Sequence, residues 1–203
     1  MIPDFFPRGL RGRTCCFTGH RFIAAHRRDD LIAAVDARIM QLYHAGYRYF
    51  MAGGALGFDM LAETEVLRAA RFDDSIRLIL ALPCRDQTAR WEEIPDYMEN
   101  LRRYKELLGR ADQVFYLSDF YTDTCMQERN RFMVEHSSAC IAYYNGYVRS
   151  GTGQTYRMAL ADGLDIFNLW DDVNPAVSDS TSKCCSSINY AVNAVPASTM
   201  PKI

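Results

Sequence analysis

The sequence predicts a single α/β fold with a mainly parallel, doubly wound (Rossmann-like) sheet and helices on both faces. Two observations predict it. Short apolar runs typical of buried strands alternate with amphipathic helical patterns along most of the 203 residues. Six such runs are separated by five helical patterns, an alternation typical of right-handed βαβ units. The order of the strands in the sheet does not follow from the sequence.

The first half of the chain contains three predicted strands and two helices. The strands are the apolar runs at residues 13–17, 47–51 and 76–82. The third run stops at Pro83, which has no N–H group to donate to a neighbouring strand. The first helix carries apolar side chains at helical spacing and ends near Gly46, a residue type that favours helix ends. The second helix extends to about Arg71.

The second half of the chain continues the alternation. Its predicted strands are the apolar runs at residues 113–117, 139–144 and 165–170. A helix over residues 97–108 is predicted from apolar side chains at helical spacing, and Gly109 closes it. Two more helices are predicted at about 126–137 and 154–161. Residues 1–173 are therefore expected to form the folded domain.

Residues 174–203 have a different character. This segment is rich in Ser, Thr, Pro and Asn, carries few charges and has no helical periodicity. A segment of this composition lacks the apolar side chains that a core requires. We therefore expect a poorly ordered tail.

Composition excludes several classes of protein. Hydrophobic residues make up 49% of the chain and charged residues 24%, which excludes a disordered or fibrous protein. The seven cysteines form no CxxC motif and no zinc-like pairing with histidine, so no disulfide framework or metal site is predicted. No apolar segment suits a membrane span or a signal peptide. A cytoplasmic protein without a membrane partner is expected.

The charge balance argues against nucleic acid as a partner. The chain has 23 Lys and Arg against 25 Asp and Glu, a formal net charge of −2. Proteins that bind mainly by neutralising phosphates usually carry a basic surplus. A homo-oligomer is compatible with the sequence.

A glycine-rich segment follows the second predicted strand. It reads Gly53-Gly54-Ala55-Leu56-Gly57 and leads into a helix. Glycine lets a ligand approach the backbone closely, and a helix N-terminus favours a phosphate. The spacing is neither the G-x-G-x-x-G of dinucleotide dehydrogenases nor a Walker A loop. Asp59 caps this helix or binds a ribose hydroxyl. The alternative is a tight turn without a ligand.

Two further segments are expected at the same edge of the sheet, where ligands of open α/β sheets bind. Thr18-Gly19-His20-Arg21 follows the first strand, and Gly151-Thr152-Gly153 lies beyond the fifth. The hydroxyl groups of the second segment could add to a phosphate nest. The alternative is a flexible turn with Thr152 or Thr155 as helix cap. Together the loops favour an anionic or nucleotide-like ligand.

The candidate ligand- and phosphate-binding residues come from these loops and from polar positions near other strand ends. They are Thr18, Gly19, His20, Arg21, Gly53, Gly54, Ala55, Gly57, Asp59, Pro83, Arg129, Asn130, Asn145, Gly151, Thr152 and Gly153. The sequence identifies no cofactor and assigns no catalytic residue.

The motifs, taken in order, resemble the YpsA-like proteins of the SLOG superfamily, which also contains the Smf/DprA DNA-processing proteins and the LOG phosphoribohydrolases. The resemblance covers about residues 13–170. The residues that carry it are Phe17-Thr-Gly-His-Arg21, Gly53-Gly-Ala-Leu-Gly-Phe-Asp59, Leu82-Pro83, Arg129-Asn130 and Gly151-Thr152-Gly153. The resemblance implies a Rossmann-like domain that binds a nucleotide or a nucleotide-derived small molecule, and supplies no established reaction.

Three functional classes follow from the residues and the resemblance. The leading class is a sensor or regulatory domain for a nucleotide derivative. The second is a nucleotide-cleaving hydrolase with Glu63, Asp59 or His20 as candidate acid or base. LOG enzymes carry a glutamate in a P-G-G-x-G-T-x-x-E loop, whereas the comparable segment at 150–155 has no carboxylate, which argues against cleavage. The third class is a DprA-like module that binds single-stranded DNA.

Overall fold

The computed structural model describes residues 8–174, and its centre is a six-stranded sheet. The strands are β1 (Thr14–Gly19), β2 (Tyr49–Ala52), β3 (Arg77–Leu82), β4 (Gln113–Tyr116), β5 (Ala139–Tyr143) and β6 (Asp165–Asn168). All five neighbouring pairs are parallel. The predicted α/β fold is confirmed. The predicted tail lies outside the described residues except for Asn174.

Helices connect the strands and follow the last one. They are α1 (Arg28–His44), α2 (Phe58–Ala69), α3 (Tyr97–Arg110), α4 (Cys125–Glu135), α5 (Gly151–Ala161) and α6 (Trp170–Val173). Three short 3-10 helices add η1 (Arg8–Arg13), η2 (Ala25–Arg27) and η3 (Gln87–Trp91). Among residues 8–174, no helix has the length and apolar character needed to cross a bilayer.

Several helix ends differ from the prediction: α2 ends at Ala69 and α4 at Glu135, each about two residues early. Helix α3 continues through Gly109 to Arg110. Helix α5 begins at Gly151, three residues earlier than expected, because Ser150 caps it: its side chain accepts a hydrogen bond from the Gly153 amide at 2.9 Å. The glycine motif is therefore the first turn of the helix, and neither Thr152 nor Thr155 is its N-cap.

The strand order is β4-β3-β2-β1-β5-β6. The chain builds outward from β1 to β4 and then crosses the sheet, so that β5 pairs with the free edge of β1. The direction of winding therefore reverses between β1 and β5. In open α/β sheets, this reversal separates the loops that leave the two strands and opens a crevice at their carboxyl ends.

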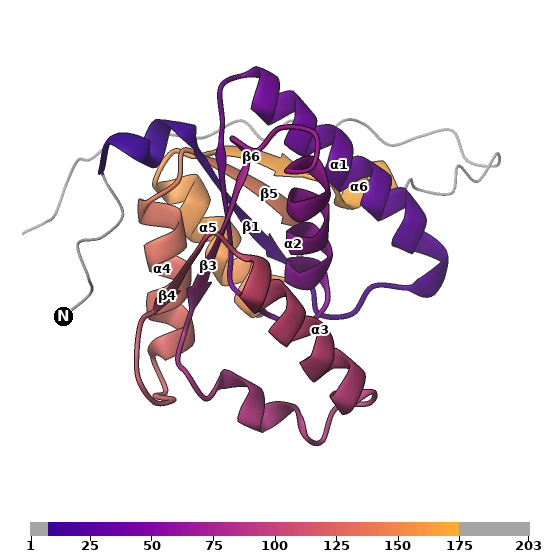
Figure 1. The fold of residues 1–203 in the computed structure, drawn as a ribbon, viewed down its shortest axis with the longest axis vertical. Coiled ribbons are helices and arrows are strands. Elements are labelled where there is room, and N and C mark those ends of the chain that lie inside the picture. The colour runs from indigo at the N-terminus through magenta and orange to yellow at the C-terminus, as the bar shows by residue number, and fades with distance from the viewer. Residues whose placement is uncertain (1–7, 175–203) are drawn as a thin grey trace, which may run out of the picture.

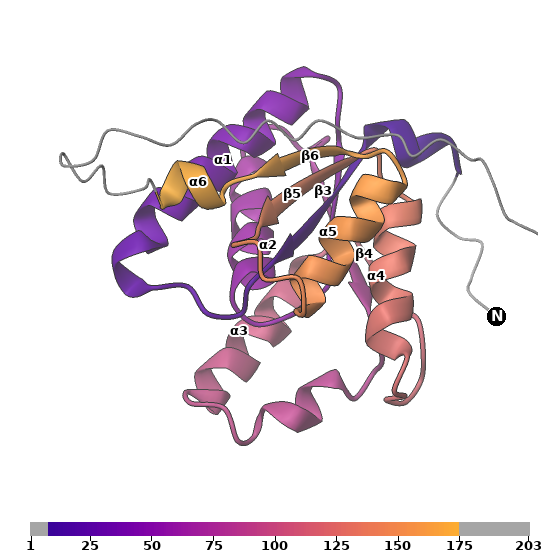
Figure 2. The ribbon, with the colours of Figure 1, turned by 180° about the vertical axis from the view of Figure 1, so that it is seen from behind.

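Helices cover both faces of the sheet, as Figure 1 and Figure 2 show from opposite sides. Successive strand residues point to opposite faces: Cys15 and Phe17 belong to the apolar cluster under α1 and α2, whereas Cys16 belongs to the cluster under α4 and α5. Helix α6 packs against α1. Both faces are buried, which explains why the central strands are apolar without alternation.

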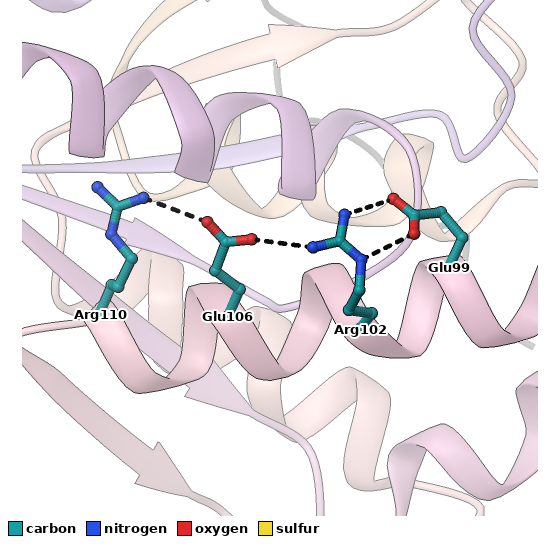
Figure 3. Close-up of polar contacts among 4 residues, drawn as sticks. All are labelled: Glu99, Arg102, Glu106 and Arg110. Atoms are coloured by element: carbon teal, nitrogen blue, oxygen red, sulfur yellow. Dashed lines mark hydrogen bonds and ion pairs between the residues drawn. The ribbon is translucent and has the colours of Figure 1, made fainter.

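Helix α3 shows how the outer surface is built. Tyr104 and Leu107 are buried, and the outer side carries alternating charges (Figure 3). The guanidinium nitrogens of Arg102 lie 2.8 Å from Glu99 Oε1 and 3.7 Å from Glu106 Oε2. Arg110 Nη1 lies 3.5 Å from Glu106 Oε1. Exposed pairs of this kind add little to stability. They neutralise two of the four basic residues of the helix, and Arg103 and the exposed Lys105 leave it with a net positive charge.

Candidate functional site

A cavity of about 380 Å³ lies at the switch point between β1 and β5. Segments from four parts of the chain form its walls: the end of β1 with the loop after it, the loop before α2, helix α4 and the first turn of α5. The lining residues are Phe17, Thr18, Gly19, His20, Arg21, Ala55, Asp59, Met126, Arg129, Asn130, Met133, Ser150, Gly151, Thr152 and Thr155.

The loop after β1 is held by contacts with two distant segments, the start of α2 and the first turn of α5. The Phe58 amide donates to the His20 carbonyl at 3.2 Å, and the Thr152 hydroxyl donates to the Gly19 carbonyl at 2.9 Å. Gly57 allows the approach from α2: it has a φ of +84°, and a Cβ there would lie 2.1 Å from the Arg21 carbonyl oxygen. This loop therefore presents Arg21 to the cavity from a fixed backbone.

His20 fastens the β1 loop to the β5 loop. Its Nε2 accepts a hydrogen bond from the Asn145 amide at 3.1 Å, so this nitrogen carries no proton in the described arrangement. Its ring meets Trp170 edge to face at 5.9 Å between centroids. These contacts give His20 a positioning role, and Asn145 contributes through its backbone without lining the cavity.

The amides of the Gly53–Gly57 loop are occupied by carboxylates of the chain itself. Asp59 Oδ2 accepts from the Gly53 amide at 3.2 Å and from the Ala55 amide at 3.3 Å. Glu63 Oε1 accepts from the Gly54 amide at 3.1 Å. The loop therefore holds two side-chain carboxyls where the sequence suggested a ligand phosphate, and a phosphate in the cavity must find other donors.

The two carboxyls are buried and share an electrostatic environment. Burial, and after it the charge of the neighbouring Asp59, raise the pKa of Glu63 to about 8, against the lowering effects of the Gly54 amide and Arg129. Burial also raises the pKa of Asp59, against the lowering effect of Arg129, the two loop amides and Arg21. Glu63 is therefore mostly protonated at neutral pH.

Arg129 brings a buried positive charge to the cavity wall. It is 8% exposed, and its Nη1 donates to the Gly53 carbonyl while its Nε donates to Asn130 Oδ1 at 2.8 Å. Burial lowers its pKa, and the charge of Asp59 opposes this effect. The guanidinium thus connects helix α4 to the loop after β2.

The first turn of helix α5 lines the cavity, while its hydroxyl groups form hydrogen bonds within the protein. Ser150 donates to the Tyr147 carbonyl, Thr152 to that of Gly19 and Thr155 to that of Gly151. The hydroxyl protons expected to add to a phosphate nest therefore hold the loop in place. The first amides of a helix have no partner within it and remain suitable for an anion.

Ten of the sixteen predicted site residues line the cavity, and six do not. Those that line it are Thr18, Gly19, His20, Arg21, Ala55, Asp59, Arg129, Asn130, Gly151 and Thr152. Gly53 lies behind Arg129. Gly54 faces Leu82 and Gln87, and Pro83 is buried at the end of β3. Gly57, Asn145 and Gly153 act through the backbone contacts described above.

Sequence reasoning missed two methionines of helix α4 that line the cavity. Met126 and Met133 line the cavity, and only the strand order could have placed them there. The predicted site residue Asp59 does line the cavity, because the loop after β2 reaches it from the other side of β1.

The order of these loops can now be compared with known proteins. The model of the YspA SLOG family matches residues 22–162. The chain belongs to this family. The resemblance read from the sequence is thereby confirmed, although the family assigns no reaction to the cavity.

The relatives of this SLOG family member support the same grouping. It is 29% identical over 161 residues to YoqJ, an uncharacterized SPbeta prophage-derived protein of Bacillus subtilis, covering 72% of this chain and 89% of YoqJ. It is 22% identical over 114 residues to a UPF0398 protein of Halalkalibacterium halodurans, covering 55% of this chain and 58% of that protein.

Two DNA processing proteins share the fold. DprA from Streptococcus pneumoniae superimposes with a TM-score of 0.53 at 16% identity, covering 78% of this chain and half (50%) of DprA. DprA from Helicobacter pylori, a protein that binds single-stranded DNA, superimposes with a TM-score of 0.52 at 19% identity, covering 82% of this chain and 69% of that one.

These neighbours overturn one expectation from the sequence. The net charge of −2 predicts that nucleic acid is not a partner. A protein that binds single-stranded DNA has this fold, so the exclusion was wrong. Net charge sums over the whole surface, whereas phosphates meet the local charge of one site.

Proposed function

We propose that the cavity between β1 and β5 binds the phosphate of a nucleotide or nucleotide-derived small molecule, as a sensor or regulatory domain would. One observation carries this proposal: two guanidinium groups, Arg21 and Arg129, line the cavity with only one carboxylate, Asp59. With Glu63 protonated behind it, the site has an excess of positive charge. That excess needs an anion.

The geometry suits a phosphate better than a simple anion. Guanidinium groups bind phosphate oxygens through two parallel hydrogen bonds. The first turn of α5 adds backbone amides and the positive end of a helix dipole. A volume of about 380 Å³ lies within the range of small-molecule sites and leaves room for more than the phosphate.

Thermal unfolding with added ligands tests the proposal. The protein is heated with AMP, ADP, ATP, GTP, cyclic nucleotides, NAD or ADP-ribose, and each mixture is then separated by chromatography. A ligand at about 100 times its Kd adds about 2.7 kcal/mol, or roughly 5–10 °C in Tm for a chain of this size. Recovery of the intact compound supports a sensor, whereas a product peak indicates turnover. No shift with any compound contradicts the proposal.

Arg21→Ala and Arg71→Ala form a matched pair of variants. Arg21 lines the cavity, whereas Arg71 is exposed in the turn after α2. Loss of a charged hydrogen bond is worth about 1.5–3 kcal/mol, so Arg21→Ala is expected to weaken nucleotide binding by roughly 10- to 150-fold. Arg71→Ala keeps the affinity of the wild type. Equal affinities for both variants would remove Arg21 from the site.

A second candidate function is the binding of single-stranded nucleic acid. The fold shared with DprA favours it, as do exposed aromatic rings beside the cavity: Phe22, 83% exposed, follows Arg21, and Tyr147, 59% exposed, precedes α5. Unpaired bases stack on such rings. An oligothymidylate should then bind with an affinity that falls steeply with salt. Phe22→Ala should weaken it, and Phe72→Ala, at a site 72% exposed after α2, should not.

A further inference from the structure

The two carboxylate oxygens of Asp59 differ in their hydrogen bonds. Oδ2 accepts the amides of Gly53 and Ala55, at 3.2 and 3.3 Å. Among the side chains and backbone groups that the structure describes, none donates a hydrogen bond to Oδ1. Oδ1 is also not fully enclosed by protein atoms. Since Asp59 is 7% exposed and lines the cavity, the cavity is where Oδ1 meets solvent.

The position of this oxygen is fixed before any ligand arrives. Two amides of one loop orient the carboxylate, and the Asp59 side chain is buried on helix α2, whose start is fastened to the His20 carbonyl. A preorganised acceptor of this kind binds a donor without losing side-chain entropy. The cations that suit a phosphate, Arg21 and Arg129, line the same cavity.

An acceptor beside a phosphate site matches the chemistry of a ribose. Vicinal hydroxyls donate two hydrogen bonds to an acceptor-only group, and carboxylates of nucleotide-binding α/β folds read the 2′-hydroxyl in this way. From this geometry, and resting on the proposed function, we propose that Asp59 Oδ1 accepts the ribose diol, so that the cavity selects ribonucleotides over deoxyribonucleotides.

Paired ligands test this selectivity on the wild-type protein. Calorimetry measures the Kd of the four ribonucleoside 5′-monophosphates and of their 2′-deoxy and 3′-deoxy counterparts. A lost hydrogen bond to a charged acceptor is expected to weaken binding of the deoxy compounds by at least ~10-fold. Equal Kd values for ribo and deoxy compounds would overturn the diol assignment while leaving the phosphate site intact. Absence of binding by every compound would overturn both proposals.

Two variants distinguish a hydrogen bond between Asp59 and the ribose diol from a general electrostatic role of Asp59. Asp59→Asn keeps the shape and an acceptor for the loop amides but places an amide group where the charge was. The ribo-to-deoxy ratio should then fall to near one. Asp74→Asn, which changes an exposed carboxylate beyond α2, should keep the wild-type ratio. If Asp59 only balances Arg129, the variant changes the affinity for both sugars equally and the wild-type ratio is already near one.

Discussion

The loops at Gly53–Gly57 and Gly151–Gly153 end at the same edge of the sheet, but their amides meet different partners. Asp59 and Glu63 accept the amides of the first loop. In the second, Ser150 accepts only the third amide of the helix, and Gly151 and Thr152 line the cavity. Glycine at a helix start therefore does not identify a phosphate loop by itself. Carboxylates within the next helical turns decide whether its amides are free.

The largest expected effect is on the pH dependence of the free energy of unfolding, and it arises from Glu63, whose carboxyl accepts an amide of the first loop. The pKa of Glu63 is about 8 in the folded state, against an ordinary value of 4.5. Between these values the folded state holds more protons than the unfolded state, so the free energy of unfolding falls as pH rises through this window. The stabilisation present below pH 4.5 is lost as the pH rises to 8, on the order of 5 kcal/mol.

Glu63→Gln measures that loss. The amide keeps an acceptor for Gly54 and cannot ionise, so the stability of the variant relative to the wild type should rise from pH 5 to pH 8 and level off above it. Urea unfolding at several pH values gives the difference between the two proteins, in which other titrating groups cancel. Parallel stability curves would show that Glu63 is ionised throughout, and the first loop would then be held by charge.

The next effect is steric and contrasts Gly53 with Gly151. A Cβ at Gly53 would lie 1.7 Å from Arg129 Nη1 and 2.9 Å from Asp59 Oδ2, whereas at Gly151 it would meet nothing within 4 Å. Overpacking a buried site costs about 1–3 kcal/mol, so Gly53→Ala should destabilise the protein by that amount and displace the guanidinium. A Gly53→Ala variant as stable as the wild type would mean that Arg129 moves freely.

The cap of the second loop is expected to have a smaller effect. Ser150→Ala removes the acceptor of the Gly153 amide and should lower the free energy of unfolding by about 1 kcal/mol. It should also weaken nucleotide binding, because the first turn of α5 loses its anchor. Thermal unfolding with and without ligand separates the two effects. An unchanged Tm would show that another group caps the helix.

The smallest effect is the control for the comparison. Gly151→Ala adds a methyl group in open space at the first turn of α5 and should change stability by less than about 0.5 kcal/mol. If ligand binding falls while stability holds, a ligand must approach the backbone at Gly151. If stability falls as well, the surroundings of Gly151 in the first turn of α5 are more tightly packed than the open space around its Cβ position indicates.

The sequence by itself determined the elements of this protein. Apolar runs and helical spacing depend on neighbouring residues, so all six strands and the main helices were found, with ends shifted by a few residues. Glycine and polar positions after the strands also located most of the cavity wall. The loop of His20 and Arg21 and the start of α5 are placed correctly by the general rule for strand ends.

Only the tertiary structure decided how those elements meet. Pairing of β5 with β1 opens the crevice and brings Arg129 to the carbonyl of Gly53, 76 residues away in the chain. Packing of helix α2 against the body also buries Glu63, which the sequence offered only as a candidate acid or base. These outcomes depend on which strand lies beside which, a choice made by long-range packing that no local pattern encodes.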